Sequence, residues 1–196
     1  ILAAALRIDE AAAARIVLPR IAGPSEVVGV GTLAGQPVKL GAGAGDNAGS
    51  ALGMGLTAGD VVVSIGTSGV VCGVSDVPSR DATGLVSGFA DATGQYLPLA
   101  CTLNGARVFD STARLLGVEH KELSDLALAA APGAGGLVFV PFMEGERAPN
   151  LPDATGSLHG ATLTSMTREN LARAAVEGVL CSLADALDCL RASGGE

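Results

Sequence analysis

Hydrophobic and polar positions change their period along the chain and so divide it into helix-like and strand-like segments. Residues 2–16, rich in Ala, Leu and Arg, predict a helix that Pro19 ends. Short β-branched runs at 26–30 and 38–40, with glycine and proline between them, predict a small hairpin or a loop and a strand. From residue 167 a Thr-x-x-Asn start and apolar positions at helical spacing predict a long amphipathic helix ending at Ser193-Gly194-Gly195.

The middle of the chain mixes both kinds of segment. Residues 60–65 predict a buried strand, and Gly66-Thr67-Ser68-Gly69 predicts a tight turn into a second strand at 70–74. The remaining expectations are a hairpin at 89–99, helices at 103–116 and 121–130, a strand at 137–140 and mostly loop at 141–161. Strands and helices in this order predict an α/β domain.

A glycine-rich turn leads into a predicted Ala-rich helix over residues 41–53 and places Asp46 near the helix N-terminus. A carboxylate there can take the proton of a bound hydroxyl while the glycine backbone approaches the ligand closely. An Asp that serves only as a helix N-cap explains the same spacing equally well. The glycines do not form the dinucleotide fingerprint in its proper context, and there is no Gly-Lys-Ser/Thr phosphate loop.

Two further segments could carry chemistry. The turn Gly66-Thr67-Ser68-Gly69 can aim backbone N–H groups and two hydroxyls at phosphate oxygens, although an ordinary hairpin tip is the commoner meaning of such residues. In the proline-bounded loop 141–150, Glu146 and Arg147 are best interpreted as a structural clamp that pairs with neighbouring backbone.

Composition narrows the class of protein. The 196 residues are 48% hydrophobic, enough for a sizeable core, and 12 Lys plus Arg against 20 Asp plus Glu give a net charge of −8. Such a chain lacks the basic surface that nucleic acid requires, and its apolar runs are too short to cross a membrane. The chain has no Trp and one Tyr, so we expect any ligand to be bound by backbone and small polar groups.

Cysteine and histidine spacing excludes several chemistries. Four widely spaced cysteines in apolar stretches are interpreted as reduced, buried thiols of a cytosolic protein: Cys72, Cys101, Cys181 and Cys189. His120 and His159 are isolated, so no protein metal site is expected. No Gly-x-Ser-x-Gly elbow surrounds Ser68, which ranks a hydrolase well below a kinase.

Three motifs in order resemble the FGGY family of carbohydrate kinases: Gly43-Ala44-Gly45-Asp46-Asn47, Ser64-Ile65-Gly66-Thr67-Ser68-Gly69, and the segment 141–149. Residues 156–160 followed by 170–177 resemble the family's C-terminal signature. Within the family, segments 97–99, 102–107 and 149–156 are most similar to xylulokinases of the actinobacterial kind.

This resemblance implies an actin-like, ribonuclease-H-like α/β fold of two domains. Residues 1–54 would end the sugar-binding domain, and 55–196 would form an incomplete nucleotide-binding domain. Asp46 would be the catalytic base and would bind the sugar together with Asn47. The nucleotide would be bound by two groups of residues: Gly66, Thr67 and Ser68 at the ATP phosphates, with Asn104 and Gly105 beside them.

The implied reaction is ATP-dependent phosphorylation of D-xylulose to D-xylulose 5-phosphate in the cytoplasm. Mg²⁺ would bridge the phosphates, as in phosphoryl transfer generally. The implied partner is a small-molecule sugar, with no nucleic acid or membrane, and family likeness adds a homodimer. Two alternatives remain open: another kinase of the family, acting on ribulose, gluconate or glycerol, or a non-catalytic nucleotide-binding module of the same fold.

Several parts of the family's apparatus have no counterpart in these residues. An amino-terminal phosphate-binding turn would precede Ile1, and a glycine-rich adenosine-binding loop would follow Glu196. The sequence therefore looks like an excerpt of a longer protein. We expect residues 1–196 alone to have little kinase activity.

Overall fold

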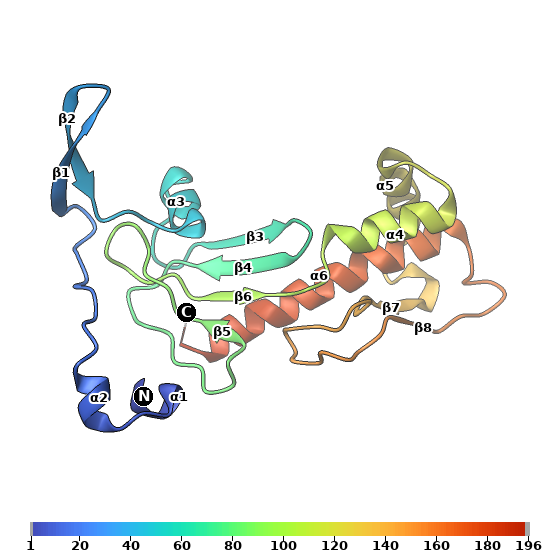
Figure 1. Cartoon of the computed structure of the whole chain (residues 1–196). Coiled ribbons are helices and arrows are strands. Elements are labelled where there is room, and N and C mark those ends of the chain that lie inside the picture. The colour runs from blue at the N-terminus through green and yellow to red at the C-terminus, as the bar shows by residue number, and fades with distance from the viewer. Residues whose placement is uncertain (1, 195–196) are drawn as a thin grey trace. The chain divides into compact units, whose positions relative to one another are not determined.

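The computed structural model describes residues 2–194, and the chain divides into two compact units between Gly43 and Ala44 (Figure 1). The first unit contains two short helices, α1 (Leu2–Leu6) and α2 (Glu10–Ala14). It also contains the antiparallel hairpin of β1 (Val27–Leu33) and β2 (Gln36–Gly41). The predicted hairpin is confirmed, with both strands longer than expected.

The prediction of a single helix at residues 2–16 is wrong, because the structure has two short helices there. Arg7 has a φ of 54°, in the left-handed region, and ends α1. Asp9 is extended, and its carboxylate accepts a hydrogen bond from the Ala12 backbone N–H at 2.6 Å. A side-chain cap of this kind starts a new helix, so a polar residue inside an Ala-rich run divides it in two.

The second unit is built around a four-stranded antiparallel sheet in the order β3-β4-β6-β5. Its strands are β3 (Val61–Ile65), β4 (Gly69–Gly73), β5 (Val86–Ser87) and β6 (Leu99–Cys101). Around it lie α3 (Asp46–Gly53), α4 (Ala106–Leu116), α5 (His120–Ala129), the short 3₁₀ helix η1 (Ala134–Gly136) and α6 (Arg168–Ala192). A separate hairpin consists of β7 (Val138–Val140) and β8 (Ser157–His159).

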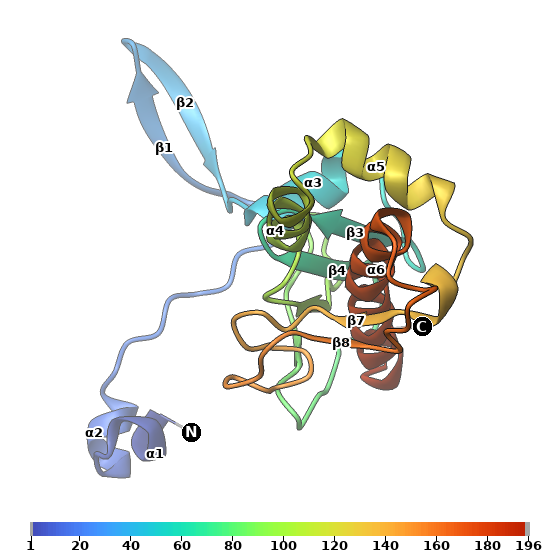
Figure 2. The ribbon, with the colours of Figure 1, turned by 90° about the vertical axis from the view of Figure 1, so that its right-hand side faces the viewer.

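Alternation along β4 places helices on both faces of this sheet (Figures 1 and 2). Val71 belongs to the buried cluster that contains Val179 and Leu183 of α6. Its neighbour Cys72 belongs to the cluster that contains Ala48 and Ala51 of α3. Successive strand residues point to opposite faces, so α6 and α3 cover the two sides of β4.

Helix α6 is the long helix that the sequence predicted. Its N-cap Thr167 accepts from the Asn170 backbone N–H at 3.1 Å, and its apolar positions pack against the sheet, α4 and α5. The helix ends at Ala192, and of the predicted end, Gly195 lies outside the described residues. No helix among residues 2–194 has the length and hydropathy needed to cross a membrane.

Two local expectations differ from the structure and a third is confirmed. The strand at 61–65 forms as predicted but is not buried, because β3 lies at the sheet edge with Val61 and Val63 exposed. Residues 141–161 are mostly loop, as expected, and include the short strand β8, whose residues pair with β7. Of the cysteines, Cys72 is buried and its burial raises the pKa of the thiol, whereas Cys181 of α6 is exposed.

Candidate active site

The turn Gly66-Thr67-Ser68 closes the hairpin of β3 and β4 and presents two exposed residues, Gly66 and Thr67. Within the turn, the backbone N–H of Gly66 donates to the Ser68 carbonyl at 3.0 Å. Thr102 fixes the following residue, because its hydroxyl oxygen accepts from the Gly69 N–H at 3.1 Å and its own N–H donates to the Gly69 carbonyl at 2.8 Å. The turn is thus held in one shape while its tip stays accessible.

Gly105 lies directly against this turn. The Ala106 N–H donates to the Gly66 carbonyl at 2.7 Å. A Cβ atom added to Gly105 would lie 2.5 Å from the Gly66 oxygen and 2.8 Å from the Ser68 carbonyl carbon, which is too close for any side chain. The structure therefore brings Gly66, Thr67 and Ser68 together with the segment Asn104-Gly105.

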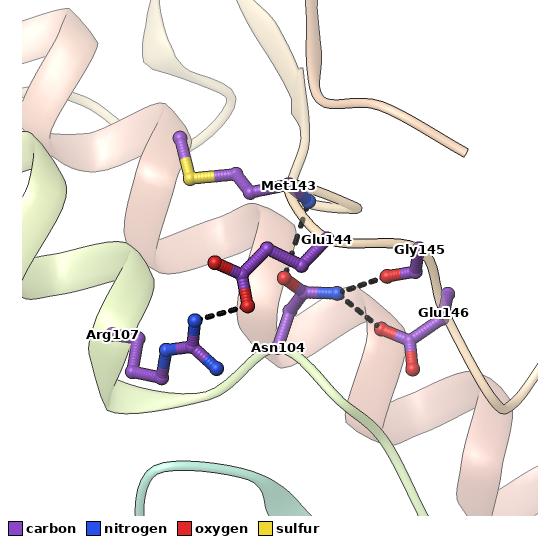
Figure 3. Close-up of polar contacts among 6 residues, drawn as sticks. All are labelled: Asn104, Arg107, Met143, Glu144, Gly145 and Glu146. Carbon is purple, nitrogen blue, oxygen red and sulfur yellow. Dashed lines mark hydrogen bonds and ion pairs between the residues drawn. The ribbon is translucent and has the colours of Figure 1, made fainter. Parts of the chain in front are cut away.

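Asn104 is buried and uses its side-chain amide to join this segment to the loop at 143–146 (Figure 3). Its Nδ2 donates to the Gly145 carbonyl at 2.8 Å and to Glu146 Oε2 at 2.9 Å, and its Oδ1 accepts from the Met143 N–H at 3.1 Å. Glu146 Oε1 accepts from the backbone N–H groups of Leu103, at 2.6 Å, and Arg147, at 2.7 Å. The pairing of Glu146 with neighbouring backbone is confirmed, whereas the Arg147 side chain is exposed.

Asp46 is the first residue of α3, and the N-cap position before it is occupied by Gly45. Asp46 is therefore not the N-cap, and its exposed carboxylate accepts from the neighbouring Asn47 N–H at 2.8 Å through Oδ1. No other hydrogen bond to this carboxylate occurs among residues 2–194. The first turn of a helix favours such a negative charge, and Oδ2 remains accessible to a ligand.

Asn47 lines a cavity of about 420 Å³ between α3 and the first two strands of the sheet. Ser64 of β3, two residues before the turn, lines the same cavity. Within the described part of the chain, however, no hydrogen bond connects Asp46 or Asn47 with Gly66–Ser68 or Asn104-Gly105. The seven predicted residues thus form two groups, one at the turn and one at the start of α3.

A polar cavity of about 320 Å³ beside Asn104 was missed by the sequence reasoning. Arg107 and Arg114 of α4 line it, and Arg107 forms an ion pair with Glu144 across it. Residues 107, 111 and 114 share one face of the helix, so their spacing was the signal that could have found this cavity.

No group of three or more His, Cys, Asp or Glu side chains within residues 2–194 is arranged to hold a metal ion.

Comparison with known proteins identifies the class. The family model for the C-terminal domain of the FGGY family of carbohydrate kinases matches residues 61–196, and the chain belongs to this family. This membership confirms the expected α/β, actin-like fold class.

Individual relatives are more specific. The chain is 44% identical over 190 residues to the xylulose kinase of Streptomyces coelicolor, covering 92% of this chain and 38% of the relative. It is 33% identical to the xylulose kinase of Haemophilus influenzae, covering 98% and 40%. The crystal structure of xylulose kinase from Bifidobacterium adolescentis matches with a TM-score of 0.84 and 47% identity, covering 95% of this chain and 38% of that one. The chain thus spans about two fifths of the length of these relatives.

Proposed function

We propose that this chain is part of an ATP-dependent kinase that phosphorylates D-xylulose to D-xylulose 5-phosphate. The observation that carries the proposal is the backbone-built turn at Gly66–Ser68, fixed by Thr102 and Gly105, in a chain that belongs to a carbohydrate kinase family. The choice of sugar is supported by relatives named xylulose kinase at 43–44% identity.

In this proposal the turn holds the phosphates of ATP. Thr67 and Ser68 supply hydroxyl groups, and the turn supplies backbone N–H groups, which together form a cradle for phosphate oxygens. Asn104 and Gly105 lie beside the nucleotide, next to the polar cavity lined by Arg107 and Arg114. ATP enters as its magnesium complex, in which the ion bridges phosphate oxygens and neutralises their charge.

Asp46 acts as the general base. Its carboxylate accepts the proton of the sugar hydroxyl as that oxygen attacks the terminal phosphorus and the bond to the leaving ADP breaks. Asn47 is assigned to the sugar, because it lines the cavity between α3 and the sheet. An exposed carboxylate with one oxygen unbonded suits this role, since it can approach a hydroxyl without first breaking another contact.

A sugar acid, gluconate, is the second candidate substrate. The chain is 35% identical over 155 residues to the gluconokinase of Bacillus licheniformis, so gluconate has a specific observation in its favour. Ribulose and glycerol remain candidates by family membership.

The test is an ADP-release assay on the complete gene product with Mg-ATP and a panel of D-xylulose, D- and L-ribulose, gluconate and glycerol. Selective ADP release with D-xylulose supports the proposal, and selective release with gluconate replaces its substrate. Silence across the panel with retained ADP binding favours a non-catalytic nucleotide-binding module.

Three accompanying predictions complete the proposal. Residues 1–54 end the sugar-binding domain and 55–196 begin the nucleotide-binding domain, although the compact units divide earlier, at Gly43. The protein is expected in the cytoplasm as a homodimer. Light scattering after size exclusion of the complete gene product measures the oligomeric state.

A further inference from the structure

Glu146 is a carboxylate in an unusual environment. Glu146 is only 1% exposed to solvent. Within residues 2–194, no lysine, arginine or histidine forms an ion pair with it. Instead it accepts three hydrogen bonds from N–H groups, two from backbone and one from the Asn104 amide. Burying a carboxylate is costly unless its oxygens are hydrogen-bonded, and here these three N–H donors supply that compensation and depend on the carboxylate as their acceptor.

Two of these donors belong to the residues directly before Gly105. Leu103 offers its backbone N–H and Asn104 its side chain, so Glu146 determines where the segment 103–104 lies. The next two residues touch the turn: Gly105 contacts the backbone of Gly66 and Ser68, and Ala106 donates to the Gly66 carbonyl. Because less space than a methyl group separates Gly105 from the turn, a shift of the segment must displace the turn as well.

We propose that Glu146 is a positioning residue for nucleotide binding: it fixes the Gly66–Ser68 turn through Leu103, Asn104 and Gly105 without touching the nucleotide. This inference rests on the proposed function in assigning the ATP phosphates to that turn. A contact 43 residues away in the chain, from loop to helix start, thereby sets the geometry of the phosphate cradle.

Replacement by glutamine tests the acceptors with little change in volume. Glu146 Oε1 accepts two backbone N–H bonds and Oε2 accepts one from Asn104. An amide offers a single acceptor oxygen, so in E146Q its NH₂ group faces either the two backbone donors or the Asn104 NH₂ group. In both orientations at least one buried donor loses its partner.

The experiment uses the complete gene product in two measurements. Hydrogen exchange without nucleotide follows the amides of Gly69, Thr102 and Ala106, which report on the junction between turn and segment, with α5 as internal reference. Calorimetry with Mg-ADP follows nucleotide affinity, and steady-state kinetics separate the KM for ATP from the KM for the sugar. Glu26→Gln is the matched control, because it removes a surface ion pair with Arg20 by the same chemical change and lies outside the reference helix.

For E146Q we expect at least tenfold faster exchange at the three amides, unchanged exchange in α5, and at least tenfold weaker Mg-ADP binding. The KM for ATP rises in parallel, while the KM for the sugar changes less than twofold. A merely structural role would instead affect α5 and both KM values together. Unchanged exchange at the three amides with unchanged ADP affinity in folded E146Q would overturn the proposal.

A double variant decides the case in which E146Q does not fold. When Asn104→Asp is combined with Glu146→Gln, the new amide at position 146 can donate to the new carboxylate at position 104. The oxygen of that amide still accepts from the Leu103 and Arg147 N–H groups. Asn104→Asp alone is the reference, because it too removes the donor to the Gly145 carbonyl. Slower exchange at the three amides in the double variant than in Asn104→Asp supports the coupling, and equal exchange in the two folded variants contradicts it.

The exchange readout also separates this inference from the proposed function. It requires no kinase activity, so a wild-type protein that is silent in the sugar panel refutes the proposed function, while the exchange rates still decide whether Glu146 fixes the turn.

Discussion

The turn at Gly66–Ser68 and the start of α3 carry the two halves of the proposed chemistry, yet they are constructed in opposite ways. The turn is formed by backbone, and Thr102, Gly105 and the buried Glu146 hold it from behind. Asp46 is an exposed side chain whose one hydrogen bond is to its own neighbour. Backbone groups that bind a ligand are positioned by contacts with distant residues. A reactive side chain such as Asp46 instead acts through its own carboxylate.

The largest expected effect is on the exposed half. Asp46→Asn removes the proton acceptor, and we expect turnover to fall by roughly 10²- to 10⁴-fold. Folding stability and Mg-ADP affinity should remain close to wild type, because no hydrogen bond joins Asp46 to the turn among the described residues. Asp188→Asn, at an exposed position of α6, is the control for loss of one surface carboxylate. Full turnover in Asp46→Asn would exclude the residue as the base.

Gly105→Ala should act on the backbone-built half. The added Cβ meets the Gly66 oxygen at 2.5 Å, so the turn must move, and we expect a loss of about 1–3 kcal/mol of unfolding free energy. Nucleotide affinity should fall with it, as measured by calorimetry beside denaturant unfolding.

The control substitution should change the unfolding free energy in the opposite direction. Gly49→Ala lies inside α3 with no atom within 4 Å of the new Cβ, and it should raise stability by about 0.5–1 kcal/mol. Equal effects of the two substitutions would mean that the close approach at Gly105 does not constrain the turn.

Thr102→Val tests the second support of the turn. The buried Gly69 N–H loses its acceptor, and we expect a cost of about 1–3 kcal/mol in urea unfolding. Thr112→Val, also buried, removes a hydroxyl that donates to the Val108 carbonyl of its own helix and should cost less. A larger loss in Thr112→Val would count against the importance of the Thr102 contact.

The smallest effect concerns pH and lies outside both halves. Hydrogen bonds from the Thr83 hydroxyl and the backbone N–H groups of Val86 and Thr83 lower the pKa of Asp81 to about 2. Because the folded pKa lies below the unfolded value, the loop's stabilisation is present above pH 3.8 and is lost as pH falls towards 2. The chemical shift of the Val86 amide proton should titrate in that window, and Asp81→Asn should abolish the titration.

Local signals predicted much of this fold, and they single out the turn and the start of α3 as the candidate site. The hairpin of β3 and β4, the helix after the glycine-rich turn and the long α6 each follow from turn residues, caps and spacing within one segment. The exposure of β3 and the hydrogen bonds that Glu146 accepts from Leu103 and Asn104 depend on tertiary neighbours that no local pattern reports.

The tetrapeptide Asp-Ala-Thr-Gly, which occurs three times, shows the same limit within one motif. At 81–84 and 91–94 the Asp carboxylate accepts from the Thr hydroxyl and N–H two residues later, so the local turn forms twice. At 153–156 the backbone bonds to another part of the chain: the Ala154 carbonyl accepts from the Gly145 N–H at 2.9 Å. The same four residues therefore form this turn at two positions and not at the third, so the motif alone does not determine the local structure.

Helix α6 has a consequence for how the second unit unfolds. Its residues take part in three of the four buried clusters, through Val179 against the sheet, Ala172 against α4 and α5, and Ala174 against η1 and β7. Loss of this one helix would therefore expose all three clusters at once. We therefore expect the sheet, the helical pair and the β7 hairpin to unfold in a single cooperative transition.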